Sequence, residues 1–270
     1  MRLISICPSN TELLAYLGLE GHLVGIDDFS DWPASILHLP RLGPDLSIDM
    51  DKLVQLQPDL VLASLSVPGM EKNVEELKRR NIPHLVLNPQ SLDDIAEDLL
   101  VVGHHTGTSE KAEDVVKHYR HFVKTYQELS GRIQAKYSLY WEWWPKPIFS
   151  PGGVNWLTEI SNLSGGWNIF QHLPIASHQS NWDEIIELDP EHICMVWVGI
   201  KQDKMKPSII KKRPGSEKMD AVIRNHIHVL DEPLYCRPSP RLLLGLKKLG
   251  AILHPSVFPV DDGIDPLLDK

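Results

Sequence analysis

The sequence predicts an α/β protein of two αβ lobes, each with a parallel-type central sheet, joined by one long α-helix. The first observation behind this prediction is an internal echo: residues 53–63, Leu-Val-Gln-Leu-Gln-Pro-Asp-Leu-Val-Leu-Ala, resemble residues 185–195, Ile-Ile-Glu-Leu-Asp-Pro-Glu-His-Ile-Cys-Met. In each copy a short amphipathic helix ends at Pro plus an acid, and an apolar run suited to a buried strand follows. The echo therefore indicates one αβ unit used twice. Coincidence is the alternative, because Leu-x-Pro-acid is a common junction between helix and strand.

The second observation is an uninterrupted helical stretch at 109–129. It contains neither Pro nor Gly, and its apolar residues recur at helical spacing: Ala112, Val115, Val116, Tyr119, Phe122, Val123 and Tyr126. Such a helix of about 20 residues is ~30 Å long. Ser109 is its predicted N-cap and Gly131 its predicted stop. We therefore predict an N-terminal lobe at 1–108, a connecting helix at 109–130 and a C-terminal lobe at 131–270.

Strand and helix patterns alternate on both sides of this helix, as expected for parallel βαβ winding. In the N-terminal lobe the predicted strands are 3–7, 23–26, 60–63 and 85–87, and the predicted helices are 11–17 and 70–80. In the C-terminal lobe the predicted strands are 137–141, 193–198 and 227–230, and the predicted helices are 156–163 and 241–253.

Composition argues against several classes of function. The 270 residues carry 27 Lys plus Arg against 36 Asp plus Glu, a net charge of −9, with no basic stripe interleaved with aromatics, so we expect no nucleic-acid partner. The one cationic cluster, 201–213, is interpreted as a solvated helix face. No stretch approaches the ~20 apolar residues of a membrane span. Because the first strand begins almost at Met1, we expect no signal peptide and, at face value, an intracellular chain; removal of a targeting segment is the alternative.

No catalytic or metal-binding motif stands out. A nucleophile elbow, a phosphate loop, a dinucleotide fingerprint and a zinc-ligand pair are all missing from the sequence. Cys7, Cys194 and Cys236 lack metal-ligand spacing and are interpreted as structural. The histidine pair 104–105 is predicted to lie solvated in a polar loop before the long helix. We therefore predict no metal, no resident cofactor and no catalytic residue.

Aromatic residues cluster near the predicted strand ends rather than along helix stripes. Phe29 and Trp32 follow the second strand, and Tyr235 lies beside Arg237 after the last one. In parallel αβ folds the loops at strand ends line the ligand crevice. We therefore predict ligand contact for Phe29, Trp32 and Tyr235.

A second aromatic group flanks two prolines and comprises Trp141, Trp143, Trp144 and Phe149. Trp143 and Trp144 suit loop packing and ligand contact equally. Arg237 and Arg241 bracket Pro-Ser-Pro, whose restricted backbone orients a guanidinium toward a ligand acid, phosphate or amide. A salt bridge at a helix start is the alternative for Arg241, which makes Arg237 the preferred contact.

Five motifs in order carry a family resemblance. They are Ile-Ser-Ile-Cys-Pro-Ser-Asn-Thr-Glu at 4–12, Val-Gly-Ile-Asp-Asp-Phe-Ser-Asp-Trp-Pro at 24–33, Pro-Asp-Leu-Val-Leu-Ala at 58–63, Gly-Gly before Asn-Ile-Phe at 165–170, and Arg-Pro-Ser-Pro-Arg at 237–241. Together they resemble the helical-backbone, class III substrate-binding proteins of ABC importers, a group that includes cobalamin, haem and siderophore carriers. The resemblance runs from Met1 to about Pro255 and implies a ligand cleft between the two lobes.

Within this family the cobalamin-binding branch is the most similar. The resemblance places that branch's ligand-contacting aromatic at Phe29, where the branch has Tyr, and its ligand-contacting Arg at Arg237. It also places Tyr235, Phe149 and Ser177 at cleft positions, and Ser64 where the branch has a contributing Trp. These departures leave the ligand open among cobalamin, another corrinoid, haem and an iron-siderophore.

The resemblance also implies docking onto ABC permease subunits through one acid on each lobe. Glu71 matches the acid of the first lobe, and Asp203 is the choice for the second, with Glu217 as its substitute. We therefore expect a non-catalytic binding protein for a corrinoid or other metal chelate. The alternative is a corrinoid-processing enzyme that uses Glu142 as acid or base, because an isolated Glu in a Trp-rich loop has its pKa raised by desolvation. Glu142 has no catalytic partner visible in the sequence, which favours binding.

Overall fold

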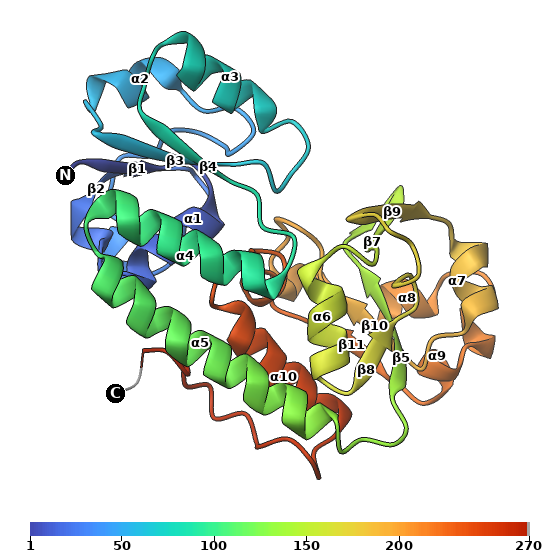
Figure 1. The fold of residues 1–270 in the computed structure, drawn as a ribbon. Coiled ribbons are helices and arrows are strands. Elements are labelled where there is room, and N and C mark those ends of the chain that lie inside the picture. The colour runs from blue at the N-terminus through green and yellow to red at the C-terminus, as the bar shows by residue number, and fades with distance from the viewer. Residues whose placement is uncertain (269–270) are drawn as a thin grey trace. The chain divides into compact units, whose positions relative to one another are not determined.

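The computed structural model describes residues 1–268 and contains two compact units, each with helices on both faces of a four-stranded sheet (Figure 1). The first unit is Met1–Arg120 together with Pro238–Pro240, and the second is His121–Arg237 continued from Arg241. The long helix α5 (Ser109–Ser130) has 22 residues and passes from the first unit into the second. The predicted class, α/β with two lobes and parallel sheets, is confirmed.

The sheet of the first unit has the order β2-β1-β3-β4, and all its strands are parallel. Its strands are β1 (Leu3–Ser5), β2 (Leu23–Ile26), β3 (Leu60–Ser64) and β4 (His84–Leu87). Its other helices are α1 (Pro8–Tyr16), α2 (Met50–Gln55), α3 (Glu71–Arg79) and α4 (Leu92–Thr106). Figure 1 shows α2 and α3 on one face of the sheet and α1 and α4 on the other.

The sheet of the second unit is also parallel, with the order β8-β5-β10-β11. Its strands are β5 (Tyr137–Glu142), β8 (Gly166–Asn168), β10 (His192–Met195) and β11 (Ile227–Val229). Its helices are α6 (Trp156–Leu163), α7 (Trp182–Leu188), α8 (Ser208–Lys211), α9 (Asp220–Ile223) and α10 (Leu242–Leu253). A small antiparallel sheet is added by β6 (Trp144–Pro145), β7 (Ile148–Pro151) and β9 (Ser177–Ser180).

The internal echo in the sequence is a repeat of structure. Numbered by their order in the chain, the strands of both parallel sheets lie in the order second, first, third, fourth. The echoed segments form α2–β3 in the first unit and α7–β10 in the second. Coincidence would not produce the same strand order around both copies, so the echo marks two lobes of one topology.

The acid of the echoed Pro-acid pair makes the same hydrogen bond in both units. Asp59 Oδ2 accepts from Arg2 N at 2.6 Å, and Glu191 Oε2 accepts from Ser138 N at 2.9 Å. The positions are equivalent, because in each unit the residue after the acid pairs with the residue after the donor. Each carboxylate therefore satisfies a backbone donor of the central strand, which explains why the acid recurs.

Left-handed backbone recurs at equivalent places as well. Gln57 (φ 47°) and Asp189 (φ 38°) end the echoed helices, and Asn81 (φ 54°) and Asn225 (φ 59°) precede the last strand of each sheet. A residue with positive φ stops a helix and turns the chain toward the next strand, and Asn and Asp adopt this region more readily than other residues with a Cβ. The two lobes therefore share their turn chemistry in addition to their strand order.

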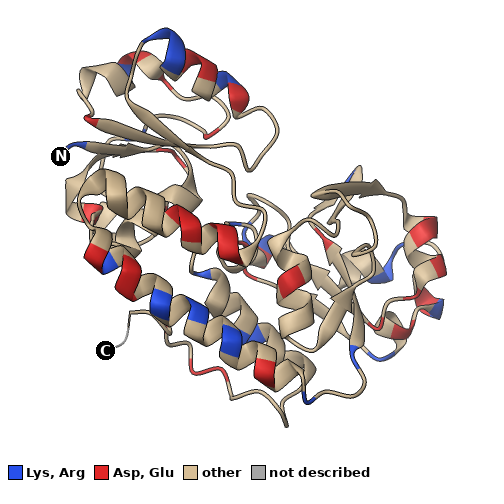
Figure 2. Ribbon diagram, in the orientation of Figure 1, with Lys and Arg blue, Asp and Glu red and all other residues tan. Residues whose placement is uncertain are grey.

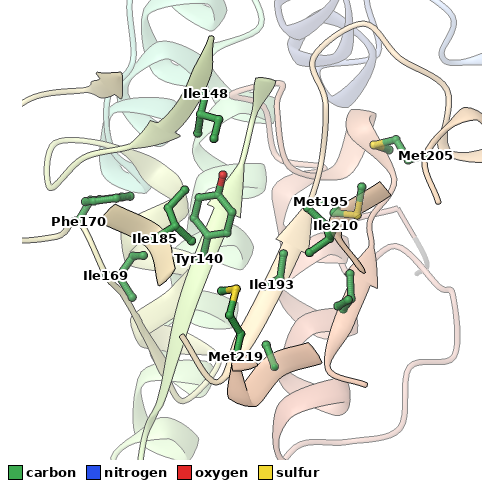
Figure 3. Close-up of a cluster of buried hydrophobic side chains, with 12 residues drawn as sticks. Tyr140, Ile148, Ile169, Phe170, Ile185, Ile193, Met195, Met205, Ile210 and Met219 are labelled. Atoms are coloured by element: carbon green, nitrogen blue, oxygen red, sulfur yellow. The ribbon is translucent and has the colours of Figure 1, made fainter. Parts of the chain in front are cut away.

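Each unit has its own apolar core. In the second unit Tyr140, Ile193 and Met195 of the sheet pack with residues of α7, α8 and α9 (Figure 3). In the first unit Ile4 and Val61 of the sheet pack with residues of α2 and α3. Charged residues lie mostly on helices and loops (Figure 2). No helix within residues 1–268 combines the length and the apolar character that crossing a bilayer requires.

Several local predictions were wrong. Helix α4 was not predicted, although Ser91 and Asp94 form a capping box at its start, and the pair 104–105 lies in its last turn, not in a loop. Helix α5 already includes Ser109, and Ala112 N donates to Thr108 O at 2.9 Å, so Ser109 is not the N-cap. The antiparallel sheet was also missed, because Pro145 and Pro147 obscure its very short first strands.

Candidate functional site

The turn after β2 presents Phe29. Asp27 is fully buried, and its Oδ1 accepts from Phe29 N at 2.7 Å and from Ser30 N at 3.0 Å. Arg41 Nη1 donates to Asp27 O at 3.0 Å and to Ser30 O at 2.5 Å. This bracing fixes the turn while the Phe29 side chain stays 47% exposed, so an ordered segment presents an aromatic side chain to solvent.

Trp32 lies on the same loop but is partly buried. Its ring is 5.4 Å from that of Tyr16, a buried residue of α1. Phe29 therefore offers more free surface to a ligand than Trp32 does.

Ser64 ends β3 and is almost completely buried. Its Oγ donates to Ser66 Oγ at 2.9 Å and accepts from Ser66 N at 3.1 Å, so the hydroxyl is used in a local turn. Glu71, the predicted docking acid of the first lobe, is exposed at the start of α3 and accepts from Gly69 N at 2.7 Å.

Trp143 and Phe149 meet where β5 continues into the antiparallel sheet. Trp143 N donates to Phe149 O at 2.9 Å, and the Trp143 ring lies 6.0 Å from that of Trp156. Trp143 Nε1 is buried and has no hydrogen-bond partner among the described residues, which leaves a donor for a ligand or water. Ser177 is exposed on β9, opposite Pro151.

Tyr235 is fully buried, and its polar groups are engaged. Its hydroxyl donates to Gly245 O at 2.9 Å, its carbonyl accepts from Trp156 Nε1 at 2.7 Å, and its ring lies 5.6 Å from that of Trp141. Burial raises the pKa of the Tyr235 hydroxyl well above its ordinary value. Of the predicted contacts, Tyr235 has the least surface to offer.

Arg237 is only 8% exposed, and its Nη2 lies 3.2 Å from Glu232 Oε2. The next residues, Pro238–Pro240, group with the first unit, where Ser239 Oγ donates to Glu12 Oε2 at 2.5 Å. Arg241 immediately precedes α10. The guanidinium of Arg237 is thus held by a mostly buried carboxylate beside a chain segment that two prolines stiffen.

Glu142 is not the isolated carboxylate that the sequence suggested, and that prediction was wrong. It is fully buried and accepts from Arg213 Nη1 at 2.5 Å and Nη2 at 2.9 Å, from Tyr140 Oη at 2.8 Å and from Trp197 Nε1 at 3.0 Å. The Arg213 guanidinium also lies 4.6 Å from the ring centroid of Trp182. The cationic cluster 201–213 was interpreted as a solvated helix face, but Arg213 is mostly buried and does not belong to such a face.

No group of three or more His, Cys, Asp or Glu side chains suited to a metal ion occurs within residues 1–268. The remaining named acid, Asp203, is exposed in the turn Gln202–Lys204, with its Oδ2 3.8 Å from Lys204 Nζ. Glu217 is exposed in the turn Ser216–Lys218.

Comparison with known proteins assigns the family. The family described as "Periplasmic binding protein" matches residues 3–234, most of the chain. The chain belongs to the periplasmic binding protein family. This membership confirms the resemblance inferred from the five motifs, and it makes the chain a substrate-binding protein of the ABC transporter type.

Two curated relatives match nearly the whole of this chain. An uncharacterized ABC transporter substrate-binding lipoprotein of Bacillus subtilis, YvrC, is 27% identical over 267 residues, covering 95% of this chain and 81% of that protein. The vitamin B12-binding protein of Vibrio parahaemolyticus is 26% identical over 248 residues, covering 90% and 85%.

Solved structures of other members share the fold. The periplasmic vitamin B12-binding protein BtuF of Vibrio cholerae has a TM-score of 0.78 at 22% identity and covers 93% of this chain and 96% of its own. Staphylococcus aureus IsdE, complexed with heme, has a TM-score of 0.83 at 16% identity and covers 94% and 98%. These two likenesses establish the fold.

Proposed function

We propose that this periplasmic binding protein binds cobalamin or a related corrinoid, without changing it chemically, for an ABC-type importer. The observation that carries the proposal is the match along nearly the whole chain to vitamin B12-binding relatives. The exposed Phe29 on its braced turn supports it, because a rigid aromatic suits a flat macrocycle. Haem or an iron-siderophore is the second candidate ligand, favoured by the heme-bound IsdE of the same fold.

The ligand is tested by titrating purified protein with cyanocobalamin, haemin and a ferric hydroxamate siderophore, using calorimetry and visible absorbance. We expect 1:1 binding of cyanocobalamin, with the ligand recovered at unchanged mass. Tight binding of haemin or the siderophore without competition by cyanocobalamin would reassign the ligand. Conversion of cyanocobalamin to a product would overturn the non-catalytic role.

The engagement of Glu142 supports binding over catalysis. A general acid or base needs access to a substrate proton, whereas this carboxylate is fully buried and accepts from three side chains, those of Tyr140, Trp197 and Arg213. Under this proposal the protein needs no resident cofactor, and its small-molecule partner is the corrinoid itself.

The permease is the proposed protein partner, with Glu71 and Asp203 as docking acids. The exposure of Glu71 at a helix start supports its role. Asp203 is less well suited, since Lys204 lies 3.8 Å away and Lys201 and Lys206 flank it in sequence. These lysines offset the negative charge that docking through an acid requires.

Replacing Phe29 with Ala is expected to weaken corrinoid binding by roughly 1–3 kcal/mol, because it removes an aromatic contact. Thermal unfolding should change little, since the side chain is half exposed. Leu37→Ala is the matched control, an exposed apolar side chain of the same unit outside the proposed site, and should bind like the parent. Calorimetry with cyanocobalamin measures both, and equal affinities would remove Phe29 from the site.

Replacing Arg237 with Lys is expected to lower the affinity for cyanocobalamin about tenfold, or roughly 1.4 kcal/mol, although the charge is kept. The planar guanidinium donates in several fixed directions, toward Glu232 and ligand amides together, and an ammonium does not. Arg241→Lys is the comparison. If only that variant loses affinity, the ligand contact belongs to Arg241.

A further inference from the structure

A row of hydrogen-bonded hydroxyls joins the end of β1 to the Phe29 turn. Ser5 Oγ lies 3.0 Å from Cys7 O, Thr11 Oγ1 lies 2.7 Å from Ser5 Oγ and also 2.7 Å from Ser30 Oγ, and Ser30 Oγ bonds Asp27 Oδ2. All the side chains in this row are buried, so bulk water does not reach them.

Four contacts of 3.0 Å or less form the row, but only three hydroxyl hydrogens are available, those of Ser5, Thr11 and Ser30. Thr11 Oγ1 also lies 3.3 Å from Cys7 O, a longer contact that shares the Thr11 hydrogen. A carbonyl oxygen only accepts, so Ser5 donates to Cys7 O, Thr11 then donates to Ser5, and Ser30 donates to Thr11. The last contact, between Ser30 and Asp27, then has no hydrogen unless Asp27 supplies one. If Asp27 is ionised, one pair of oxygens must face each other at hydrogen-bond distance without a proton.

We propose that Asp27 is a positioning residue for the ligand, and that in its protonated form it closes this row and holds the turn that presents Phe29. The inference rests on the proposed function for the role of Phe29 as a contact. Protonation at Oδ2 leaves Oδ1 free to accept from Phe29 N and Ser30 N, as the structure has it. Both carboxyl oxygens of Asp27 then have hydrogen-bond partners.

The charges around Asp27 agree with this protonation state. Arg41 directs its guanidinium to the carbonyls of Asp27 and Ser30 instead of the carboxyl group. The other titratable neighbours, Asp45 on the loop before α2 and Cys7 at the start of α1, supply no positive charge. Burial raises the pKa of Asp27 from 3.8 to about 6, and the Asp45 charge adds to the rise, whereas the hydrogen bonds that the ionised carboxylate would accept from Ser30 and Phe29 oppose it.

Asparagine mimics the protonated acid, because its Oδ1 accepts from the two backbone amides and its Nδ2 donates to Ser30 Oγ. Asp27→Asn should therefore bind cyanocobalamin as tightly as the parent does at pH 5, and its affinity should stay constant from pH 5 to 8. The parent should lose affinity as pH rises past about 6. Asp27→Ala, which removes both acceptor and donor, should lose about tenfold. Asp28→Asn, next to it and exposed, is the control for charge and should follow the parent.

A ligand-free measurement separates this inference from the proposed function. The carboxyl carbon of Asp27, followed by NMR in the unliganded parent, should titrate near pH 6. The amide protons of Phe29 and Ser30 should be more protected from exchange below that pH, and protected throughout in Asp27→Asn. Titration below pH 4 would overturn the inference whatever the ligand is. If cyanocobalamin fails to bind while these signals behave as expected, the ligand assignment is wrong and the positioning role stands.

Discussion

Replacing Arg213 with Met is expected to lower the free energy of unfolding by about 3–5 kcal/mol, because a fully buried carboxylate then loses its counter-ion. Glu142 accepts hydrogen bonds from both Nη1 and Nη2 of Arg213, so the guanidinium is its counter-ion. Tyr140 and Trp197 still donate after the substitution, but neither carries charge. Neutral donors do not offset the desolvation of an ionised group.

Chemical denaturation at pH 7, followed by tryptophan fluorescence, measures this loss. All tryptophans except Trp32 lie in the second unit, so the signal reports mainly on that unit. Lys212→Met is the matched control, an adjacent exposed cation whose loss should cost no more than about 0.5 kcal/mol. The double variant Glu142→Leu/Arg213→Met should be more stable than Arg213→Met alone, because it leaves no unpaired charge. A loss below about 1 kcal/mol in Arg213→Met would show that the pair contributes little.

The second unit is expected to lose about 3 kcal/mol of stability between pH 7 and pH 4.5, because it buries neutral histidines. His192 is buried at the start of β10, and its Nδ1 lies 2.9 Å from His228 Nε2. Its ring also stacks on His226, with centroids 4.3 Å apart. Burial, together with the charges of the neighbouring histidines, lowers the pKa of His192 from 6.5 to about 3 and that of His228 from 6.5 to about 4.

The direction of the pH effect follows from these depressed pKa values. Above pH 6.5 these histidines are neutral in both the folded and the unfolded chain, so they do not lower the free energy of unfolding. As pH falls below 6.5, these histidines become protonated in the unfolded chain but stay neutral in the folded unit, and this difference favours unfolding. Converting the two pKa shifts in full would give a loss of stability larger than about 3 kcal/mol. The expected loss is smaller because both rings keep some contact with solvent and titrate as a coupled pair.

His192→Phe tests this expectation. The ring can still pack between His226 and Tyr137, but it cannot be protonated, so the loss of stability toward pH 4.5 should be markedly smaller. His104→Gln, an exposed histidine on α4, is the matched control and should keep the parent's profile. Denaturation midpoints at half-unit pH steps measure both. Parallel profiles for parent and His192→Phe would place the acid sensitivity elsewhere.

Local patterns in the sequence were sufficient for the two-lobe class, the long helix at 109–130 and most strands. Strand β2 begins and ends where the apolar run at 23–26 does, and α6 coincides with the predicted helix at 156–163. These elements depend on residues close together in the chain, whose periodicity is readable directly. The Pro-acid echo was also readable, although only the strand register shows that Asp59 and Glu191 bond equivalent strands.

The candidate site was predicted less completely. The sequence placed Phe29 and Arg237 near strand ends through turn residues and motif likeness, and the structure puts Phe29 on an exposed, braced turn. It did not predict that Tyr235 would be packed beneath α10, because whether an aromatic faces a core or a ligand depends on what covers it. The sequence also did not indicate that the buried Asp27 side chain accepts a hydrogen bond from the backbone amide of Phe29.

By itself the sequence determined the family, the two-lobe α/β class and the positions of most strands and long helices, since these follow from local hydrophobic periodicity and ordered motifs. Only the tertiary structure decided the partners of the buried polar groups. Arg213 reaches Glu142 across 71 positions, His228 reaches His192 across 36, and Ser30 reaches Thr11 across 19. Parallel strands need crossover connections, so residues that meet at one edge of a sheet are far apart in the chain, and their protonation follows from burial that no local pattern specifies.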